Sequence, residues 1–432
     1  MVSIAQCSYP ACVDDMSRRR APRSREECQA LDAADPLGAL RGRFSLDEGL
    51  VYLDGNSLGA MPASARARVD AVLAEEWGQG LISSWTDAGW IEAPARLGAK
   101  LAPLLGASAD EVIVCDSTSV NLFKLLGAAL ASRPGRRVVL TEQSNFPTDV
   151  YVAEGLGELS GRGWEVRRVL RSQIEEAMSD DVGVLLLTHV DYSTGYIHDM
   201  RALTAAARGA GILTIWDLSH SAGAVPLDLG ACGVDLAVGC GYKYLNGGPG
   251  APAYIYMARR VAGSLTSPIQ GWMGHARPFD FSPVYEPARG LSRFLAGTPS
   301  IIALAALEAA LDAWEGVDIQ ALREKSTALT ETFIALVDER CEGLGVEVIS
   351  PRPARLRGAQ VSLRHPHGYQ VVRALRERGV VGDSRPPDIM RFGFAPLYTR
   401  FTDAWDAADA ILDLLRTGAW SEERHALRLR VT

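Results

Sequence analysis

The chain has 432 residues, and its 44 Lys and Arg against 52 Asp and Glu give a formal net charge of −8. Apolar residues make up 47% and charged residues 22%, which is ordinary for a soluble globular protein of two or three domains. The acidic balance argues against a nucleic-acid or anionic-membrane surface, because both require clustered positive charge. No apolar run reaches the roughly 18 residues of a membrane span.

The cysteine and histidine patterns carry no metal or disulfide signature. The seven cysteines are scattered, with no C-x-x-C pair, and this excludes a disulfide framework or a zinc ribbon. His365 and His367 form a lone pair in a Pro- and Arg-rich stretch, so no metal is predicted. The basic cluster near the start follows the weakly apolar part, the reverse of a secretory signal. We expect a cytoplasmic protein.

In chain order, residues 1–25 are polar and aperiodic and predict a disordered tail. Residues 26–60 form an N-terminal segment that we expect to pack on a small C-terminal domain. Residues 61–315, between this segment and the small domain, alternate short apolar runs with amphipathic stretches. This pattern predicts a large domain with a mostly parallel, seven-stranded type of sheet covered by helices. The predicted strands are Val112–Cys115, Val138–Leu140, Val184–Thr188, Ile212–Trp216, Val234–Val238 and Ala253–Met257.

Helical periodicity fills the gaps between these strands and continues beyond them. The predicted helices of the large domain are Ala63–Trp77, Val120–Ala131, Thr148–Leu159 and Met200–Gly209, with a long helical region over about 300–338. The small domain, residues 316–432, combines strands Val346–Ile349, Gln360–Arg364 and Ile389–Phe392 with helices Tyr369–Arg378 and Asp403–Arg416. The fold class predicted is α/β, a large domain plus a smaller α+β domain.

The segment Ile212–Gly250 is the richest in chemistry. One buried strand ends in Asp217, with His220 just beyond it, and the next leads into Tyr242 and Lys243 among glycines. Ligands of open α/β sheets bind beyond the carboxyl ends of the strands. A pyridoxal phosphate (PLP) site needs a lysine amine for a Schiff base and a carboxylate that keeps the pyridine nitrogen protonated. A structural Asp217–Lys243 ion pair is the alternative.

A phosphate cradle is the next requirement. Cys115–Asn121 follows a strand and opens a helix, where hydroxyls and free N–H groups meet the positive helix end. Simple N-capping by Ser117 or Thr118 is the competing interpretation. The absence of G-x-G-x-x-G and of G-x-x-x-x-G-K-[ST] weakens a dinucleotide or nucleoside triphosphate hypothesis.

Two further positions suit a ligand site. In Ser144–Asp149, Phe146 could stack on a cofactor ring, and Asp149 could bind a ligand or cap the next helix; core packing with capping is the default. Arg391 is a cation inside an apolar strand, and a buried guanidinium needs an anionic partner. That partner is either a substrate carboxylate or a structural carboxylate.

Taken in order, these pieces resemble the kynureninase family, PLP enzymes of fold type I in the aspartate aminotransferase superfamily, and specifically the bacterial type. The likeness runs from about residue 26 to the end, and its motifs are Tyr52–Gly59, Trp77–Trp85, Ser117–Lys124, Ser144–Asp149, Trp216–Gly223, Tyr242–Gly250, Gly271–His275 and Arg391–Tyr398. Motifs spread in order over most of a chain are far more specific than any one of them.

The resemblance implies a role for each matching position. Lys243 becomes the Schiff-base lysine and Asp217 the partner of the pyridine nitrogen. The other implied cofactor contacts are Thr118, Ser119, Phe146, Asp149, Thr188, His220 and Tyr242, with Trp272 and Thr298 reaching the site from a neighbouring subunit, which implies a homodimer. The implied substrate contacts are Arg391, Asn56, Trp85 and His275.

The family reaction is hydrolysis of L-kynurenine to anthranilate and L-alanine. Tyr242 is the predicted acid that protonates Cβ, and a purely phosphate-binding role is its alternative. Thr298 and Trp85 stand where other family members carry polar residues, so we expect a preference for kynurenine over 3-hydroxykynurenine.

Two competing functions remain on the same fold. A cysteine desulfurase or class V aminotransferase is the first, but a desulfurase needs a mobile nucleophilic cysteine. Cys341 is the only cysteine after Lys243, and its surroundings predict a helix end. A catalytically silent binding protein is the second, and it would be expected to have lost Lys243, Asp217 or Arg391, all of which are present.

Overall fold

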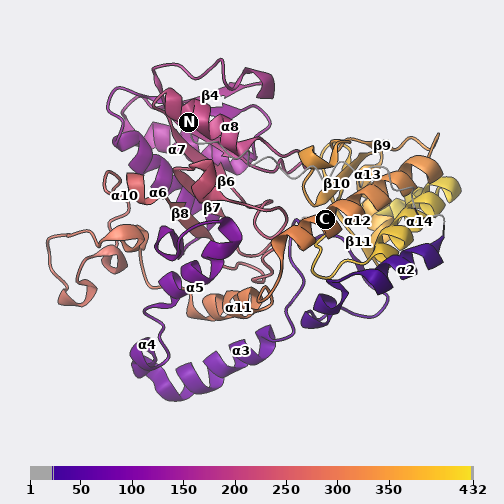
Figure 1. The fold of residues 1–432 in the computed structure, drawn as a ribbon, viewed down its shortest axis with the longest axis horizontal. Helices are drawn as coiled ribbons and strands as arrows, with labels where there is room; N and C mark the ends of the chain where they lie inside the picture. The colour runs from indigo at the N-terminus through magenta and orange to yellow at the C-terminus, as the bar shows by residue number, and fades with distance from the viewer. Residues whose placement is uncertain (1–21, 23, 430–432) are drawn as a thin grey trace, which may run out of the picture. The chain divides into compact units, whose positions relative to one another are not determined.

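The computed structural model describes residue 22 and residues 24–429. The tail predicted over residues 1–25 therefore lies almost wholly outside the described residues. By their contacts the residues fall into two compact units (Figure 1). Among the described residues, unit 1 comprises those up to Ala63, Tyr192–Ile197 and those from Gly316 onward, and unit 2 comprises Ser64–Asp191 and His198–Glu315. The short segment Tyr192–Ile197 belongs to unit 1 although it follows a strand of unit 2, and no sequence pattern indicated this.

Unit 2 is built on a seven-stranded sheet of order β2-β8-β7-β6-β5-β3-β4. Its strands are β2 (Val112–Val114), β3 (Val138–Glu142), β4 (Glu165–Val169), β5 (Val182–Thr188), β6 (Leu213–Asp217), β7 (Leu236–Gly239) and β8 (Tyr254–Met257). Only β8 runs antiparallel to its neighbours, so the predicted mostly parallel α/β sheet is confirmed. The strands β5 and β6 are buried throughout, which explains their unbroken apolar runs.

Capping residues mark the ends of some helices of unit 2. Asp199 accepts a hydrogen bond from the N–H of Ala202 at the start of α8, and Gly161 ends α7 in the left-handed conformation. The α-helices are α3 (Ala65–Ala71), α4 (Ser84–Asp87), α5 (Ala93–Leu101), α6 (Thr118–Ala131), α7 (Pro147–Ser160), α8 (Met200–Gly209), α9 (Leu229–Cys232), α10 (Arg259–Ala262) and α11 (Ile301–Asp312). Helix α6 packs its apolar residues on the sheet, forming one continuous core.

Shorter helical turns connect these elements. A π-helix, η2 (Val72–Gly80), continues α3 where the sequence predicted one regular helix to Trp77. The 3₁₀ turns are η3 (Leu81–Ser83), η4 (Ala102–Leu105), η5 (Ala109–Glu111), η6 (Arg171–Gln173), η7 (Trp272–Gly274), η8 (Pro278–Asp280) and η9 (Gly290–Phe294). No helix among the described residues is both long enough and apolar enough to cross a bilayer.

Unit 1 is an α+β unit. Its antiparallel sheet has the order β12-β13-β10-β9, and a separate parallel pair joins β1 to β11. The strands are β1 (Val51–Tyr52), β9 (Glu347–Val348), β10 (Gln360–Arg364), β11 (Val380–Val381), β12 (Asp383–Arg385) and β13 (Ile389–Gly393). The helical elements are α2 (Arg25–Ala34), η1 (Gly38–Arg43), α12 (Ile319–Arg340), η10 (Ala354–Leu356), α13 (Gly368–Glu377), α14 (Phe401–Thr417), η11 (Ala419–Ser421) and α15 (Glu423–Ala426).

Phe333 of α12 anchors the core of unit 1. Its ring centroid lies 5.3 Å from that of Phe392 and 5.1 Å from that of Phe394, and all three side chains are fully buried. Such aromatic clusters bury large apolar areas and fix the helix against the sheet. The same strand, β13, thereby holds Arg391 in a fixed register.

Candidate active site

The predicted reactive side chains of unit 2 lie at the carboxyl ends of three neighbouring strands. Thr188 ends β5 and is the register partner of Asp217, which ends β6. The next strand, β7, leads directly into Tyr242 and Lys243. Because neighbouring parallel strands point the same way, these side chains meet at one edge of the sheet.

Lys243 lies among two aromatic rings. Its Nζ is 5.9 Å from the ring centroid of Phe146 and 5.8 Å from that of Tyr242. Phe146 is held in place by Asn145, whose Oδ1 accepts the backbone N–H of Phe146 at 2.8 Å and also bonds Thr188. Asn145 was not singled out from the sequence, although its place inside the Ser144–Asp149 motif could have drawn attention to it.

Two buried carboxyl groups share the field of Lys243. Burial raises the pKa of Asp217 and, more strongly, that of Asp149, whose pKa is raised further by Asp217 itself; Lys243 partly offsets both effects. Thr188 donates to Asp149 Oδ2 at 3.3 Å. Asp149 is therefore a buried carboxyl group in the first turn of α7 and is not its N-cap.

Only one carboxylate oxygen of Asp217, Oδ1, accepts hydrogen bonds from the described residues. Ser219 donates to its Oδ1 through both the backbone N–H, at 2.8 Å, and the hydroxyl, at 2.6 Å. Its Oδ2 makes no hydrogen bond within the described part of the chain. Lys243 supplies one positive charge for the two carboxyl groups Asp217 and Asp149. A second cation at Asp217 Oδ2 would balance the remaining negative charge, and a protonated pyridine nitrogen is such a cation. The residues present thus fit PLP.

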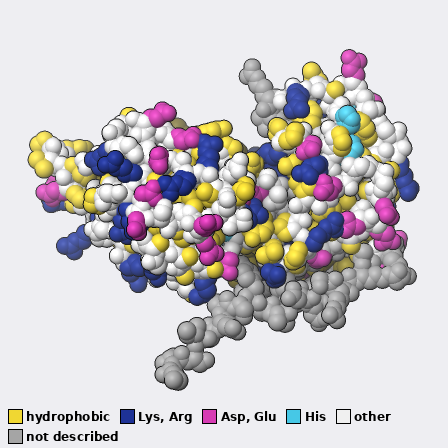
Figure 2. Space-filling view, turned by 90° about the horizontal axis from the view of Figure 1, so that it is seen from above, with side chains coloured by type: hydrophobic (Ala, Val, Ile, Leu, Met, Phe, Trp, Pro, Cys, Tyr) yellow, Lys and Arg dark blue, Asp and Glu magenta, His cyan; other side chains and the backbone are white. Residues whose placement is uncertain are grey.

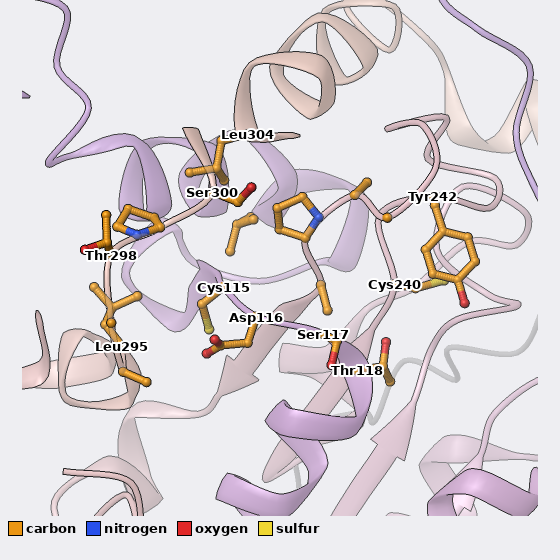
Figure 3. Close-up of a pocket in the computed structure, with 18 residues that line it drawn as sticks. Cys115, Asp116, Ser117, Thr118, Cys240, Tyr242, Leu295, Thr298, Ser300 and Leu304 are labelled. Atoms are coloured by element: carbon orange, nitrogen blue, oxygen red, sulfur yellow. The ribbon is translucent and has the colours of Figure 1, made fainter. Parts of the chain in front are cut away.

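The predicted cradle forms at the start of α6. Ser117 is the N-cap, and its Oγ accepts the N–H of Val120 at 3.4 Å, so the capping interpretation holds for this residue. Thr118 and Ser119 are the first two helical residues, whose N–H groups have no partner within the helix. A cavity of about 380 Å³ is lined by Ser117, Thr118, Tyr242 and Thr298 but not by Ser119 (Figure 3). This combination can bind a phosphate group.

Of three further predicted residues, one lines this cavity and two do not. Thr298 lines it from its own chain, at the end opposite Tyr242 in Figure 3. Trp272 is 38% exposed and contacts the rings of Phe279 and Phe281. His275 is buried with both ring nitrogens engaged, Nδ1 by the N–H of Arg277 at 2.9 Å and Nε2 by the carbonyl of Val284 at 3.2 Å. Neither Trp272 nor His275 lines the cavity.

His220 and Trp85 are the remaining predicted positions in unit 2. His220 is buried in the turn that follows Asp217. His189, which the sequence did not single out, shares a hydrogen bond of 2.9 Å with Ser221, and burial lowers its pKa to about 3, so it is neutral. Trp85 is half-buried and packs edge-on against Trp90, with ring centroids 5.8 Å apart.

Arg391 and Asn56 belong to unit 1. Arg391 is 1% exposed and forms a two-pronged ion pair with Asp383, with Nε to Oδ1 at 2.7 Å and Nη2 to Oδ2. Nη2 also donates to Ser57, at 3.0 Å, and Nη1 to the carbonyl of Tyr192, at 2.7 Å. Four of the five N–H groups of the guanidinium are thereby used, and one on Nη1 is left.

Asn56 is fully buried and supports this cluster from the side. Its Nδ2 donates to Gln360 Oε1 at 3.3 Å, and Gln360 in turn donates to the Tyr192 carbonyl at 3.0 Å. Gln360, Ser57 and Asp383 were all missed from the sequence. A polar residue inside the apolar strand β10 was the one available signal for Gln360.

Comparison with solved structures shows which proteins share this fold. Solved structures with the same fold include a cysteine desulfurase from Thermococcus onnurineus NA1 (TM-score 0.75, 18% identity, 88% of this chain and 98% of that one) and the desulfurase CsdA from Escherichia coli (TM-score 0.74, 18% identity, 88% and 98%). The chain therefore has the fold of these enzymes.

Sequence relatives narrow the class. The kynureninase of Burkholderia mallei (strain SAVP1) is 50% identical over 95% of this chain and 100% of its own length, and that of Pseudomonas fluorescens is 51% identical over the same shares. The family model "Kynureninase C-terminal domain" matches residues 322–411. The chain belongs to the kynureninase family, whose cofactor is PLP.

Proposed function

We propose that the chain hydrolyses L-kynurenine to anthranilate and L-alanine. The observation that carries the proposal is Lys243 set beside Phe146 and Tyr242, in the field of the two buried carboxyl groups Asp217 and Asp149. The direct test is anthranilate fluorescence on adding kynurenine to the purified protein. Sulfide release from cysteine without anthranilate would contradict the proposal.

Bound PLP supplies an aldehyde for a lysine amine and a ring that draws electrons away from the substrate Cα. Within that chemistry Lys243, once its amine is released, would accept the Cα proton. Asp217 would hold a proton on the ring nitrogen through Oδ2, and Phe146 would pack on the ring face. Each of these roles uses a side chain at the same edge of the sheet.

Tyr242 is the proposed acid toward Cβ. Burial raises its pKa, and the Cys240 thiol and Asp217 raise it further, so the phenol keeps its proton throughout the neutral range. A protonated phenol beside Lys243 is able to donate, although its raised pKa makes it a weak acid. Binding phosphate as a neutral donor is the alternative role for the same group, and both require the hydroxyl.

Arg391 is the proposed ligand of the substrate α-carboxylate. Its charge is already balanced by Asp383, and its remaining donor is a single N–H on Nη1. We therefore expect an end-on contact from Nη1 rather than a bidentate one, with Asp383 retained in the substrate complex. Asn56 acts through Gln360 to hold the Tyr192 carbonyl against Nη1.

The proposed substrate preference is kynurenine over 3-hydroxykynurenine. It rests on Thr298 and Trp85 at the two positions that the family resemblance assigns to the aryl group, because a pocket that does not hydrogen-bond the added hydroxyl gains little from it. A kcat/KM ratio above one for kynurenine over its 3-hydroxy analogue is expected. A ratio below one would contradict the preference without touching the reaction type.

A homodimer with active sites at the subunit interface is also proposed. Large apolar side chains are exposed on η2, on η3 and at η8 with its C-cap, and isolated soluble monomers rarely expose large apolar patches. They are Trp77, Leu81, Ile82, Phe279 and Phe281. By contrast, acidic and basic side chains are interspersed over the face in Figure 2, with no large basic patch. Light scattering on the purified protein at twice the mass of 46.4 kDa is expected.

A cytoplasmic location is proposed with it. The cysteines within residues 24–429 are all free thiols, as suits a reducing compartment. The desulfurase alternative finds no support from them: Cys341 caps the end of α12, is buried, and has its pKa raised by burial to about 11. A thiol in that state is not a nucleophile.

A further inference from the structure

Lys124 is a lysine in the middle of α6 whose side chain is 0% exposed. A buried ammonium is costly unless it is paired and hydrogen-bonded. Its Nζ donates to Asp116 Oδ2 at 2.6 Å, to the carbonyl oxygen of Phe294 at 2.7 Å and to the sulfur of Cys115 at 3.5 Å. All three donors of the ammonium are therefore used.

These partners belong to two walls of the cavity described above. Cys115 and Asp116 line it and lead directly into Ser117 and Thr118. Phe294 ends η9, and the residues that follow it, Leu295 to Ser300, line the facing wall (Figure 3). One ammonium thus ties the phosphate-side turn to the wall that carries Thr298.

The turn itself needs such a tie. Asp116 has a φ of +46°, in the left-handed region that residues with a Cβ adopt at a cost of about 1 kcal/mol. Its carbonyl accepts the N–H of Ala253 at 2.8 Å, and Asn121 Nδ2 donates to the carbonyl of Cys115 at 2.8 Å. Among the described residues, Lys124 makes the one ion pair with this turn.

The ion pair between Lys124 and Asp116 also changes the charge of the cavity. Asp116 lines the cavity next to the positive end of α6, where an unpaired carboxylate would repel a phosphate dianion. We propose that Lys124 is a positioning residue for the cofactor phosphate. Its ammonium neutralises Asp116 and joins the turn to the Phe294 carbonyl. The inference rests on the proposed use of this turn as the phosphate cradle.

The test is a titration of the full-length apoprotein with PLP and, separately, with pyridoxal, which lacks the phosphate. Lys124→Met is expected to raise the Kd for PLP about tenfold, equivalent to about 1.4 kcal/mol, and to leave the Kd for pyridoxal within about twofold. Adding Asp116→Asn should restore PLP binding to within about threefold of the wild type. Equal loss for PLP and pyridoxal, or no rescue by Asp116→Asn, would overturn the inference.

Lys325→Met is the matched control. Lys325 forms a buried ion pair with Asp35 at 2.7 Å, with side chains 6% and 5% exposed, and both residues lie in unit 1. Its loss should lower the unfolding temperature and leave the Kd for PLP unchanged. A rise in that Kd equal to the rise for Lys124→Met would reduce Lys124 to a general stabilising role.

The single variant Asp116→Asn keeps the inference testable if Lys124→Met does not fold. The Asp116 side chain is 29% exposed, and an amide oxygen can still accept from Lys124. Because the cavity then gains net positive charge, PLP should bind at least as tightly as to the wild type. Weaker binding would contradict the proposal, whereas a wild type that binds no PLP would instead sink the proposed function.

Discussion

Asp383 and Arg391 face each other as register partners on the antiparallel strands β12 and β13 and form a buried two-pronged ion pair. The pair leaves Arg391 oriented and charge-balanced before any ligand arrives. The carboxylate-binding group of the proposed site is therefore preorganised by its own sheet.

Removing Asp383 should be severe for stability. Asp383→Ala leaves a buried guanidinium with no counter-charge on that edge, and loss of one partner of such a pair typically costs about 3 kcal/mol or more. The matched control is Asp338→Ala, which breaks the pair to Arg352 whose side chains are 54% and 45% exposed. The control should cost at most about 1 kcal/mol. Urea unfolding of both variants decides it, and equal losses would contradict the account.

Asp54 should make stability depend on pH. Burial and the neighbouring Asp383 raise its pKa to about 7. The folded chain then holds this proton where the unfolded chain, with a pKa of about 3.9, has lost it. Stability contributed by the protonated group is full at acid pH and is lost as pH rises toward 7. Asp54→Asn should flatten that decline in unfolding temperature, and an unchanged pH profile would refute the assignment.

The two carboxyl groups near Lys243 should not be equivalent. Asp217→Asn removes the group that holds the ring-nitrogen proton, and we expect kcat on kynurenine to fall about 100-fold or more. Asp149→Asn keeps the hydrogen bond from Thr188 and should lower kcat by at most about tenfold. Steady-state kinetics of both variants in the same buffer compare them. A larger loss for Asp149→Asn would exchange the two roles.

Tyr242 can be tested without disturbing its packing. Tyr242→Phe removes the hydroxyl alone, so a lower kcat with an unchanged Kd for PLP identifies the proton donor. A higher Kd with unchanged kcat at saturating PLP identifies a phosphate contact instead. We expect the first result, with kcat reduced about 100-fold.

The sequence predicted the fold well in the elements whose burial produces a clear hydrophobic pattern. Continuous apolar runs marked the central strands, because both their faces are covered by helices. It missed β4, Glu165–Val169, because this edge strand is largely exposed and reads as a charged loop. The short strands β11 and β12 were missed because two or three residues carry no periodicity.

The site was predictable only in part. Asp217, Tyr242 and Lys243 stand at strand ends that the sequence pattern locates. The sequence pattern does not locate the residues that orient the site. Asp383 meets Arg391 only through antiparallel register, and Lys124 looks like an ordinary surface lysine of a helix. Contacts made across a fold leave no local signature in composition or spacing.

The central claim is that Lys243 carries the cofactor. Borohydride reduction of the PLP-loaded protein, followed by digestion and mass spectrometry, reads this out as one lysine peptide bearing a pyridoxyl group. We predict that the modified peptide contains Lys243 and that Lys243→Ala abolishes the label together with anthranilate formation. A pyridoxyl group on another lysine, or none at all, would contradict the account.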